Sequence, residues 1–429
     1  MNRFSDFLSS KLPFYYGYLI VVVAVLAQVC ASPGQTFAVA AFTPYLQESL
    51  GLSSSKLAAA YMLGTLLAAI PLVAIGPLSD RFGLRGTTAC VAIALAGACF
   101  LASRVTGFAS LLVAFMLLRF LGQGALVLLS GNIVSMWFQT RLGTVTSVMN
   151  AGGAAAFAIV PLVLIGAIQG FGWRMTYVAL GMFILLSLVP LLVLTLRNRP
   201  EDLGQFPDGL RIDAETAGLA AAQTPVDLTL PQALRDRTFW ILGGGMAVWG
   251  MIGTGLVFYA LPIFQQYGVA PEQSKMLFTT LSLSMLVAQV VGGVLADRNP
   301  MHGLLCISFV LLAAGVAVIP LTSSVWHVHI FAGLFGLGQG LTHSVSSTMW
   351  VRYYGRQHLG KIRGTVWCAM VAGSGLGPFV LGIIVDTWGS FAPGIWLYVG
   401  LLLPLAPLSL LATKPRVAAP SVLPLSRAA

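Results

Sequence analysis

LLVAFMLLRFLGQGALVLLSGNIVSM, residues 111–136, is a long apolar run that contains a single charged side chain, Arg119. A helix of about 20 apolar residues is long enough to cross the hydrocarbon core of a bilayer, which is roughly 30 Å thick. Similar runs recur along the whole chain, which is 57% hydrophobic and only 8% charged, whereas soluble proteins carry about 25% charged residues. The runs lack the alternation of apolar and polar residues found in membrane β-barrels. The sequence therefore predicts an all-α membrane protein.

Twelve transmembrane helices are predicted, and the first is read as a span because it lacks the small-residue cleavage pattern of a signal peptide. With the N-terminus inside, eighteen basic residues lie on the inner side, and only Lys56, Arg104, Arg174 and Lys275 lie on the outer side. This bias places both termini in the cytoplasm and the protein in the inner or plasma membrane. It also explains the net charge of +10 without a nucleic-acid partner. The spans lie near residues 16–38, 56–78, 87–103, 110–134, 143–168, 175–196, 239–263, 273–296, 302–321, 326–349, 364–385 and 391–412.

One polar segment, residues 197–237, separates two groups of six spans and holds seven of the thirteen acidic residues. Its content of Ala, Gly, Thr and Pro predicts a mostly flexible linker. The expected organisation is therefore an N-terminal six-helix half over 1–196, a cytoplasmic linker over 197–237, a C-terminal six-helix half over 238–412 and a cytoplasmic tail over 413–429.

The two halves repeat each other in sequence. An even number of spans gives both copies the same orientation, so the repeats are parallel and related by an axis along the membrane normal. That architecture places a substrate site at mid-membrane between the halves and moves one half against the other. The matching segments, in the same order and at nearly constant offset, are Gly76-Pro-Leu-Ser-Asp-Arg81 with Gly293-Val-Leu-Ala-Asp-Arg298, Gly122-Gln-Gly124 with Gly338-Gln-Gly340, and Gly143-Thr-Val145 with Gly364-Thr-Val366.

These motifs resemble those of the major facilitator superfamily over essentially the whole chain. The segment Gly76-x-x-x-Asp80-Arg81-x-Gly83-x-Arg85 is similar to the family's signature between spans two and three, and Arg119-Phe-Leu-Gly122-Gln-Gly124 is similar to its fourth-span motif. The resemblance implies a secondary transporter with twelve helices in two pseudo-symmetric halves, working by alternating access. Shorter motifs look like the monocarboxylate and oxalate–formate transporter branch: Pro33-Gly-Gln-Thr36, Gly172-Trp-Arg174 and Arg199-Pro-Glu-Asp202.

The chain departs from that branch in its charged residues. Span one has no Lys, and neither 277–296 nor 364–385 contains a basic residue, although members of the branch carry basic residues in these spans. A single fixed positive charge suits a monoanion better than a dicarboxylate.

Asp80 and Asp297 lie at the ends of spans two and eight, where a carboxylate can compensate the positive N-terminus of a facing helix. The facing helices are expected to be spans eleven and five, which begin near Gly364 and Gly143. Such contacts would close the cytoplasmic side and break when it opens; the alternative is a plain positive-inside turn. The predicted cytoplasmic gate consists of Gly76, Asp80, Arg81, Gly83, Arg85, Asp297 and Arg298.

Arg119 is the strongest candidate for the substrate site. An arginine at the centre of a bilayer costs roughly 2.5–3.5 kcal/mol on insertion scales, so such residues usually face a cavity, a ligand or a partner helix. The repeat aligns it with Phe335, so the charge belongs to one half only. One interpretation is a counter-charge that grips the carboxylate of an anionic substrate. The other is a structural arginine that donates to backbone carbonyls or polar side chains between helices.

Further polar residues are predicted to line the path. Gln28 and Gln35 share one face of span one, and the intervening Pro33-Gly34 can loosen the helix and expose carbonyls; the alternative is hydrogen bonding between helices. His343 is a candidate for proton coupling, together with Arg119, or else a packing residue. The remaining candidates for substrate binding are Asn150, Gln289 and Tyr259.

The expected function is proton-coupled transport of a small monocarboxylate or related organic anion. No Asp or Glu lies at the centre of a predicted span, so the substrate's own carboxylate could carry the proton. The chain has no GxxxxGK[ST] motif and no Ser–His–Asp set, paired carboxylates or metal-ligand cluster, so an enzyme, a cofactor and a metal are not expected. The expected partners are the organic anion, protons and the lipid bilayer, and the chain is expected to be a monomer. The alternatives are a proton-driven efflux transporter for hydrophobic compounds and a membrane sensor that transports nothing.

Overall fold

The computed structural model describes residues 11, 14–52, 54–209, 227–269 and 276–415. Over these residues the chain is helical and contains no strand. The longer elements before the linker are α2 (Gly17–Cys30), α3 (Thr36–Leu50), α4 (Ser54–Phe82), α5 (Leu84–Ser103), α6 (Phe108–Leu118), η2 (Arg119–Leu126), α7 (Val127–Trp137), α8 (Leu142–Phe183), η3 (Ile184–Leu188) and α9 (Val189–Thr195). Those after it are α12 (Arg237–Phe258), α13 (Ala260–Gln266), α15 (Met276–Arg298), α16 (Met301–Val318), α17 (Val325–Tyr354), α18 (Leu359–Trp388) and α19 (Ala392–Leu410).

The helices account for the twelve predicted spans. Ten segments of the described chain are long and apolar enough to cross a membrane. One of them, residues 142–195, turns at Gly172, whose φ of 78° separates two helices, so it supplies two spans. The twelfth is α17, which is less apolar because it carries polar residues such as His343 and Ser344. These side chains contact α12 and α15, so they do not require a polar partner in the lipid.

The first span is broken in the middle, as the Pro33-Gly34 pair predicts. α2 ends at Cys30, a single 3₁₀ turn follows at Ser32–Gly34, and Gln35 is extended before α3 begins at Thr36. Proline has no N–H to continue the α-helical ladder, so the turn leaves backbone carbonyls without a helical partner. The predicted loosening of this helix is therefore confirmed.

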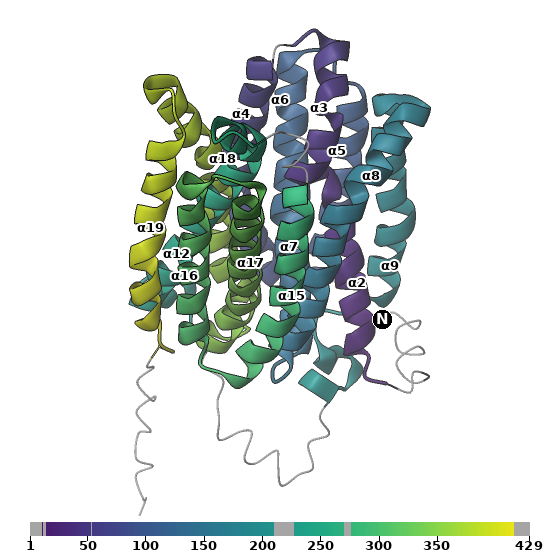
Figure 1. The fold of residues 1–429 in the computed structure, drawn as a ribbon. Coiled ribbons are helices and arrows are strands. Elements are labelled where there is room, and N and C mark those ends of the chain that lie inside the picture. The colour runs from purple at the N-terminus through teal and green to yellow at the C-terminus, as the bar shows by residue number, and fades with distance from the viewer. Residues whose placement is uncertain (1–10, 12–13, 53, 210–226, 270–275, 416–429) are drawn as a thin grey trace, which may run out of the picture.

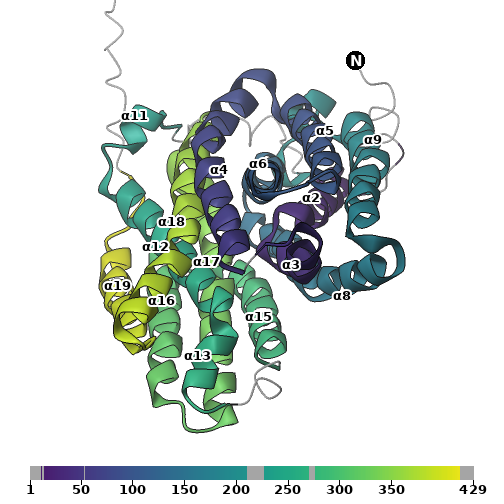
Figure 2. The ribbon, with the colours of Figure 1, turned by 90° about the horizontal axis from the view of Figure 1, so that it is seen from above.

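The elements lie in two groups that run along a common direction (Figure 1). Seen from above, α2–α9 gather on one side and α12–α19 on the other (Figure 2). The groups meet where α4 crosses α18 and where α8 crosses α15.

Glycines permit both crossings. A Cβ on Gly76 would collide with the backbone of Gly360, and a Cβ on Gly293 would collide with the backbone of Gly143. Small residues at a crossing let two helix backbones approach closely within a membrane. The repeated Gly76 and Gly293 of the sequence therefore hold the two halves together at equivalent places.

Candidate functional site

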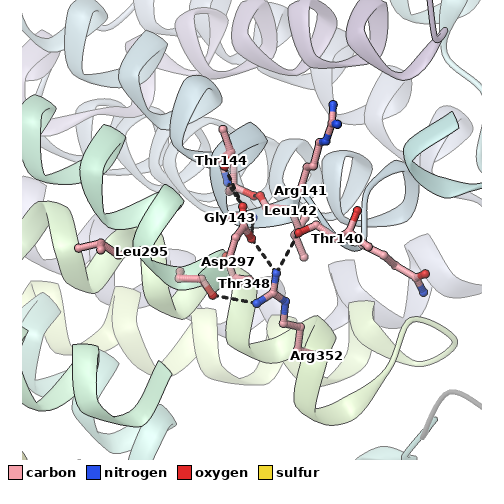
Figure 3. Close-up of polar contacts among 12 residues, drawn as sticks. Thr140, Arg141, Leu142, Gly143, Thr144, Leu295, Asp297, Thr348 and Arg352 are labelled. Carbon is pink, nitrogen blue, oxygen red and sulfur yellow. Dashed lines mark hydrogen bonds and ion pairs between the residues drawn. The ribbon is translucent and has the colours of Figure 1, made fainter. Parts of the chain in front are cut away.

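Asp297 joins the two halves at one end of the molecule (Figure 3). Its carboxylate accepts hydrogen bonds from the N–H groups of Gly143 and Thr144, at 2.8 and 2.9 Å, and from the Thr144 hydroxyl at 2.8 Å. These donors form the first turn of α8, where the helix dipole favours a negative charge. Arg352 of α17 pairs with the same carboxylate at 2.6 Å and also donates to the Thr140 carbonyl at 3.3 Å.

Asp80 makes the equivalent contact in the other copy of the repeat. Its carboxylate accepts from the N–H groups of Gly360 and Lys361, at 3.2 and 3.0 Å, in the first turn of α18. Each acid therefore caps a helix of the opposite half, and the helices are those that the sequence pairs with them. We call the end of the molecule that carries Asp80 and Asp297 the latched end.

Among the other predicted gate residues, Gly76 packs against Gly360 of the opposite half, whereas the described contacts of Arg81, Gly83 and Arg85 stay within the first half. Arg81 lies over the Phe82 ring at 5.3 Å. Arg85 donates from its backbone to Asn198 at 2.9 Å and from its guanidinium to a carbonyl of α9 at 2.5 Å, all within the first half. Gly83, with φ of 82°, permits the turn between α4 and α5.

The basic residue that pairs with Asp297 is Arg352 of the same half, not the adjacent Arg298. Arg298 is exposed at the end of α15, whereas Arg352 pairs with Asp297 from the neighbouring α17. The signature motif points to Arg298, because it follows the acid directly in sequence. A residue on another helix cannot be found from the motif alone.

Two acids of the linker also cap turns at the latched end. Asp208 accepts from three successive N–H groups, those of residues 139–141, at 2.8 to 3.3 Å. Asp227 accepts from the N–H groups of Arg356 and Gln357 at 2.7 and 2.9 Å. The described parts of the linker are therefore tied to the loops that precede α8 and α18, unlike the flexible segment that composition predicts; residues 210–226 lie outside the described chain.

Arg356 adds a further tie at this end. Its guanidinium donates to the carbonyl of Met136 on α7 and lies 3.7 Å from the carboxylate of Glu201 in the linker. Burial lowers the pKa of Arg356, and the nearby Glu201 opposes that shift. The guanidinium thus bridges the second half to both the first half and the linker.

The opposite end, which we call the open end, contains a wide cavity between the halves. It has a volume of about 1190 Å³ and is lined by the outer parts of α3, α4, α8, α12 and α15. Pro44 and Leu57 line it from the first half, and Phe258 and Phe278 from the second. These residues lie at the ends of their helices that are farthest from Asp80 and Asp297.

A smaller central pocket of about 250 Å³ lies deeper between the halves and shares Thr36 and Phe37 with the wide cavity. Five residues predicted from the sequence line it together: Gln28, Gln35, Asn150, Gln289 and His343. The first three belong to the first half and the other two to the second. The structure thus gathers most of the predicted lining at the interface of the repeats.

Several polar atoms in this pocket have no hydrogen-bond partner within the described residues. They are the Asn150 Nδ2, the Trp249 Nε1, the Gln123 Oε1 and the Gln289 Oε1, each buried. A buried donor or acceptor without a partner costs about 1–3 kcal/mol. Unpaired donors and acceptors facing one pocket are therefore suited to a small polar solute that satisfies both kinds.

Arg119 lies behind the wall of this pocket and is absent from its lining. The side chain is 1% exposed. It donates to the Gly34 carbonyl at 3.1 Å and to the hydroxyls of Thr65 and Thr36 at 3.1 and 3.3 Å, and it lies 5.0 Å from the Tyr61 ring. The Gly34 carbonyl is one that the break in span one frees. The Nη2 of Arg119 has no hydrogen-bond partner within the described chain.

Tyr259 is not brought together with the other candidates. It packs against Phe258 and Phe391, with ring centroids 5.0 and 5.4 Å away, and lines neither cavity. His343 contacts the Trp249 ring edge-on, at 5.2 Å between centroids.

Arg363 is a buried cation that lies one residue before the predicted span 364–385, and therefore in a predicted cytoplasmic loop. α18 begins at Leu359, several residues before the predicted start of the span, so Arg363 belongs to the helix. It is only 8% exposed and donates to the Ser135 hydroxyl of α7 at 3.2 Å. The repeat contained a signal for it, because the offset that aligns Gly143 with Gly364 aligns Arg363 with Leu142.

Comparison with known proteins agrees with this architecture. The sequence profile of the Major Facilitator Superfamily matches residues 24–270 and 250–427. The MFS-type transporter pynF of Aspergillus niger is 26% identical over 315 residues, which cover 71% of this chain and 66% of the fungal protein, just under two thirds of its length. The uncharacterized MFS-type transporter YhjX of Escherichia coli is 23% identical over 366 residues, covering 83% of this chain and 85% of YhjX.

Two solved structures share the fold. The transporter FucP in its outward conformation superposes with a TM-score of 0.69 at 12% identity, over 94% of this chain and all 100% of FucP. The human organic anion transporter MFSD10 (TETRAN) superposes with a TM-score of 0.68 at 17% identity, over 93% of this chain and 100% of that protein.

Proposed function

This chain belongs to the Major Facilitator Superfamily and is a multi-pass membrane transporter, and we propose that it carries a small monocarboxylate or related organic anion by alternating access. The observation that supports the proposal most is the central pocket, where unpaired amide and indole groups from both halves face one space. Within the described residues the lining contains no carboxylate. An anion would therefore meet the two unpaired donors, Asn150 Nδ2 and Trp249 Nε1, without repulsion from a carboxylate of the described lining.

Buried positive charge supports an anionic substrate. The Arg119 guanidinium lies behind Thr36, which lines the pocket, and donates a hydrogen bond to the Thr36 hydroxyl. Arg363 lies below the same pocket, towards the latched end. Neither forms an ion pair with a carboxylate of the described chain. Electrostatic attraction is stronger in a low-dielectric interior than in water, so both charges favour an anion in the pocket.

The positive-inside bias of the sequence orients the molecule in this proposal. It places the latched end, with the linker and both termini, in the cytoplasm of an inner or plasma membrane. The wide cavity then faces outward, and the solute enters the pocket from that side. Rocking of the halves breaks the Asp80 and Asp297 contacts, opens the latched end and closes the wide cavity.

Proton coupling is the second part of the proposal. His343 lines the pocket, and its imidazole is the side chain of the described lining that can carry a proton. The proton crosses either on His343 or on the carboxylate of the solute. A His343→Gln variant separates the two routes, because only the first predicts loss of gradient-driven uptake with exchange retained.

Efflux of hydrophobic compounds is the competing function, and the wide cavity favours it. Its lining is largely apolar, with Phe37, Phe157, Phe258 and Phe278 facing the space. A purely hydrophobic cargo would, however, leave the polar atoms of the central pocket unpaired, and this cost favours the organic anion.

The test is uptake of labelled lactate, pyruvate and formate into proteoliposomes, with and without an inward proton gradient. Saturable uptake that the gradient accelerates is the expected result. The matched variant is Asn150→Val, which gives this position the residue found at the equivalent Val371; we expect uptake to fall by about tenfold, since it removes a donor to a charged group. Absence of saturable uptake for all three anions would contradict the proposed substrate class, and uptake that ignores the gradient would contradict the coupling.

A further inference from the structure

Arg363 faces a small chamber of about 30 Å³ between the central pocket and the latched end. Gln28, Asn150 and His343 line both the chamber and the central pocket, so the two spaces are adjacent. The chamber adds the hydroxyls of Ser346 and Ser347. Within the described residues its lining contains no carboxylate.

The first half covers the guanidinium. The Ser135 hydroxyl of α7 accepts a hydrogen bond from its Nη1 at 3.2 Å. A Cβ on Gly131, one turn earlier in α7, would lie 2.8 Å from its Nη2. Gly131 thus leaves the room that the charged group occupies, and α7 closes over it.

This cover crosses the boundary between the halves. Arg363 lies two residues beyond Lys361, whose N–H is held by Asp80 of the first half. The Asp80 contact, the Ser135 bond and the Gly131 contact therefore all join the start of α18 to the first half. Movement of α18 away from α4 and α7 breaks them together.

A buried arginine without a carboxylate partner is unfavourable unless another anion or polar group satisfies it. From this geometry we infer that Arg363 forms a second binding station for the carboxylate of the transported anion, and that this station becomes accessible from the latched side only when the halves separate there. The inference rests on the proposed function. In it, the solute is held first by the amide groups of the central pocket and then by a bidentate contact with Arg363.

The station predicts a difference between the two faces of the membrane. With the transporter in proteoliposomes of known orientation, exchange of labelled pyruvate, lactate or formate is measured while the anion concentration is varied on one face at a time. In Arg363→Gln the half-saturating concentration on the latched side should rise by about tenfold, as expected for loss of a charge-assisted contact, and that on the open side should stay close to the wild-type value. Arg363→Lys should recover part of the loss.

Two controls keep the result interpretable. Arg235→Gln removes an exposed cation from a loop at the latched end and should change neither constant. Ser135→Ala removes the covering hydroxyl while keeping the arginine, and should lower the half-saturating concentration on the latched side by about fivefold, the equivalent of one hydrogen bond. If Arg363→Gln does not fold, Ser135→Ala tests the station alone. A lower half-saturating concentration on the latched side supports the station, and an unchanged or higher one overturns it.

The outcomes separate the two proposals. A wild-type protein that exchanges none of the three anions would overturn the proposed function and this station with it. A wild-type protein that exchanges them, with Arg363→Gln unchanged or equally weakened from both faces, would overturn the station alone.

Discussion

Arg119 and Arg363 are both buried arginines that form no ion pair within the described chain, yet their hydrogen bonds differ in kind. The bonds of Arg119 go to Gly34, Thr36 and Thr65, all in its own half. The bond of Arg363 goes to Ser135 of the other half. If the halves move as rigid bodies, the first set survives the transport cycle and the second must break. Arg119 therefore stabilises its own half, whereas the bond of Arg363 breaks when the halves move.

The largest expected effect is on stability, in Arg119→Gln. The variant removes the donor to the Gly34 carbonyl, which the break in span one leaves without a helical partner. We expect a loss of about 2–4 kcal/mol, since hydrogen bonds to charged groups contribute about 1.5–3 kcal/mol each. Thermal unfolding of the purified protein in detergent measures it. A variant as stable as the wild type but unable to bind the anion would show that Arg119 contacts substrate, the interpretation that this geometry disfavours.

The second prediction compares two glycines, one beside each arginine. In Gly122→Ala the new methyl group would lie 2.9 Å from the Ala31 carbonyl and 3.0 Å from the Gly34 backbone, neither of which can move easily. In Gly131→Ala the three nearest atoms belong to the guanidinium of Arg363, the far end of a flexible side chain. Overpacking against fixed atoms costs about 1–3 kcal/mol, so Gly122→Ala should lower the unfolding temperature. Gly131→Ala should leave it nearly unchanged and slow exchange of the anion. Equal losses of stability would contradict the distinction.

The third prediction concerns the two latches, whose bonds also cross between the halves. Asp297 accepts three hydrogen bonds from the first half, whereas Asp80 accepts two from the second half. Arg352 pairs with Asp297 within the second half and adds a bond across the halves to the Thr140 carbonyl. Asp297→Asn should therefore favour opening by about 2 kcal/mol and Asp80→Asn by about 1 kcal/mol. Amide hydrogen exchange in the first turns of α8 and α18 reports the opening. Asp386→Asn, at an exposed position near the end of α18, should change neither rate.

The smallest expected effect is that of Asp208→Asn. Its three acceptor bonds are exposed and join the linker to the loop before α8 of the same half. We expect a loss of about 0.5 kcal/mol, because solvent-exposed charge interactions contribute little. Thermal unfolding should register it while anion exchange stays at the wild-type rate; a clear change in exchange would place the linker in the moving parts.

Much of this architecture is visible in the sequence. The spans, the break at Pro33-Gly34 and the pairing of Asp80 and Asp297 with spans eleven and five follow from hydrophobic periodicity, proline chemistry and the repeat. Four of the residues that line the central pocket, Gln28, Gln35, Asn150 and Gln289, were found as polar residues in apolar runs.

The remainder depends on packing that periodicity does not encode. Whether Arg119 faces the pocket or the break in span one is a matter of side-chain direction, which its sequence position leaves open. The sequence does not show that Arg363 belongs to the helix, because a basic residue at the end of a span looks the same as those of the adjoining positively charged loop. The sequence does not distinguish the packed position of Tyr259 from a place in the pocket, since an aromatic residue in a span can pack against helices or face a cavity equally well.

Alternating access requires that the latched end open in every transport cycle, and a reversible cross-link tests this opening most directly. The Ser147 hydroxyl of α8, one turn beyond Gly143, lies 3.3 Å from the Ser344 hydroxyl of α17, so cysteines at these two positions are close enough for a disulfide between the halves. Cysteines at positions 147 and 344, in a chain whose five native cysteines are replaced, should allow uptake of labelled pyruvate when reduced. Oxidation should abolish uptake and reduction should restore it, with either single-cysteine variant unaffected. Undiminished uptake by the oxidised, cross-linked protein would show that the latched end need not open during transport.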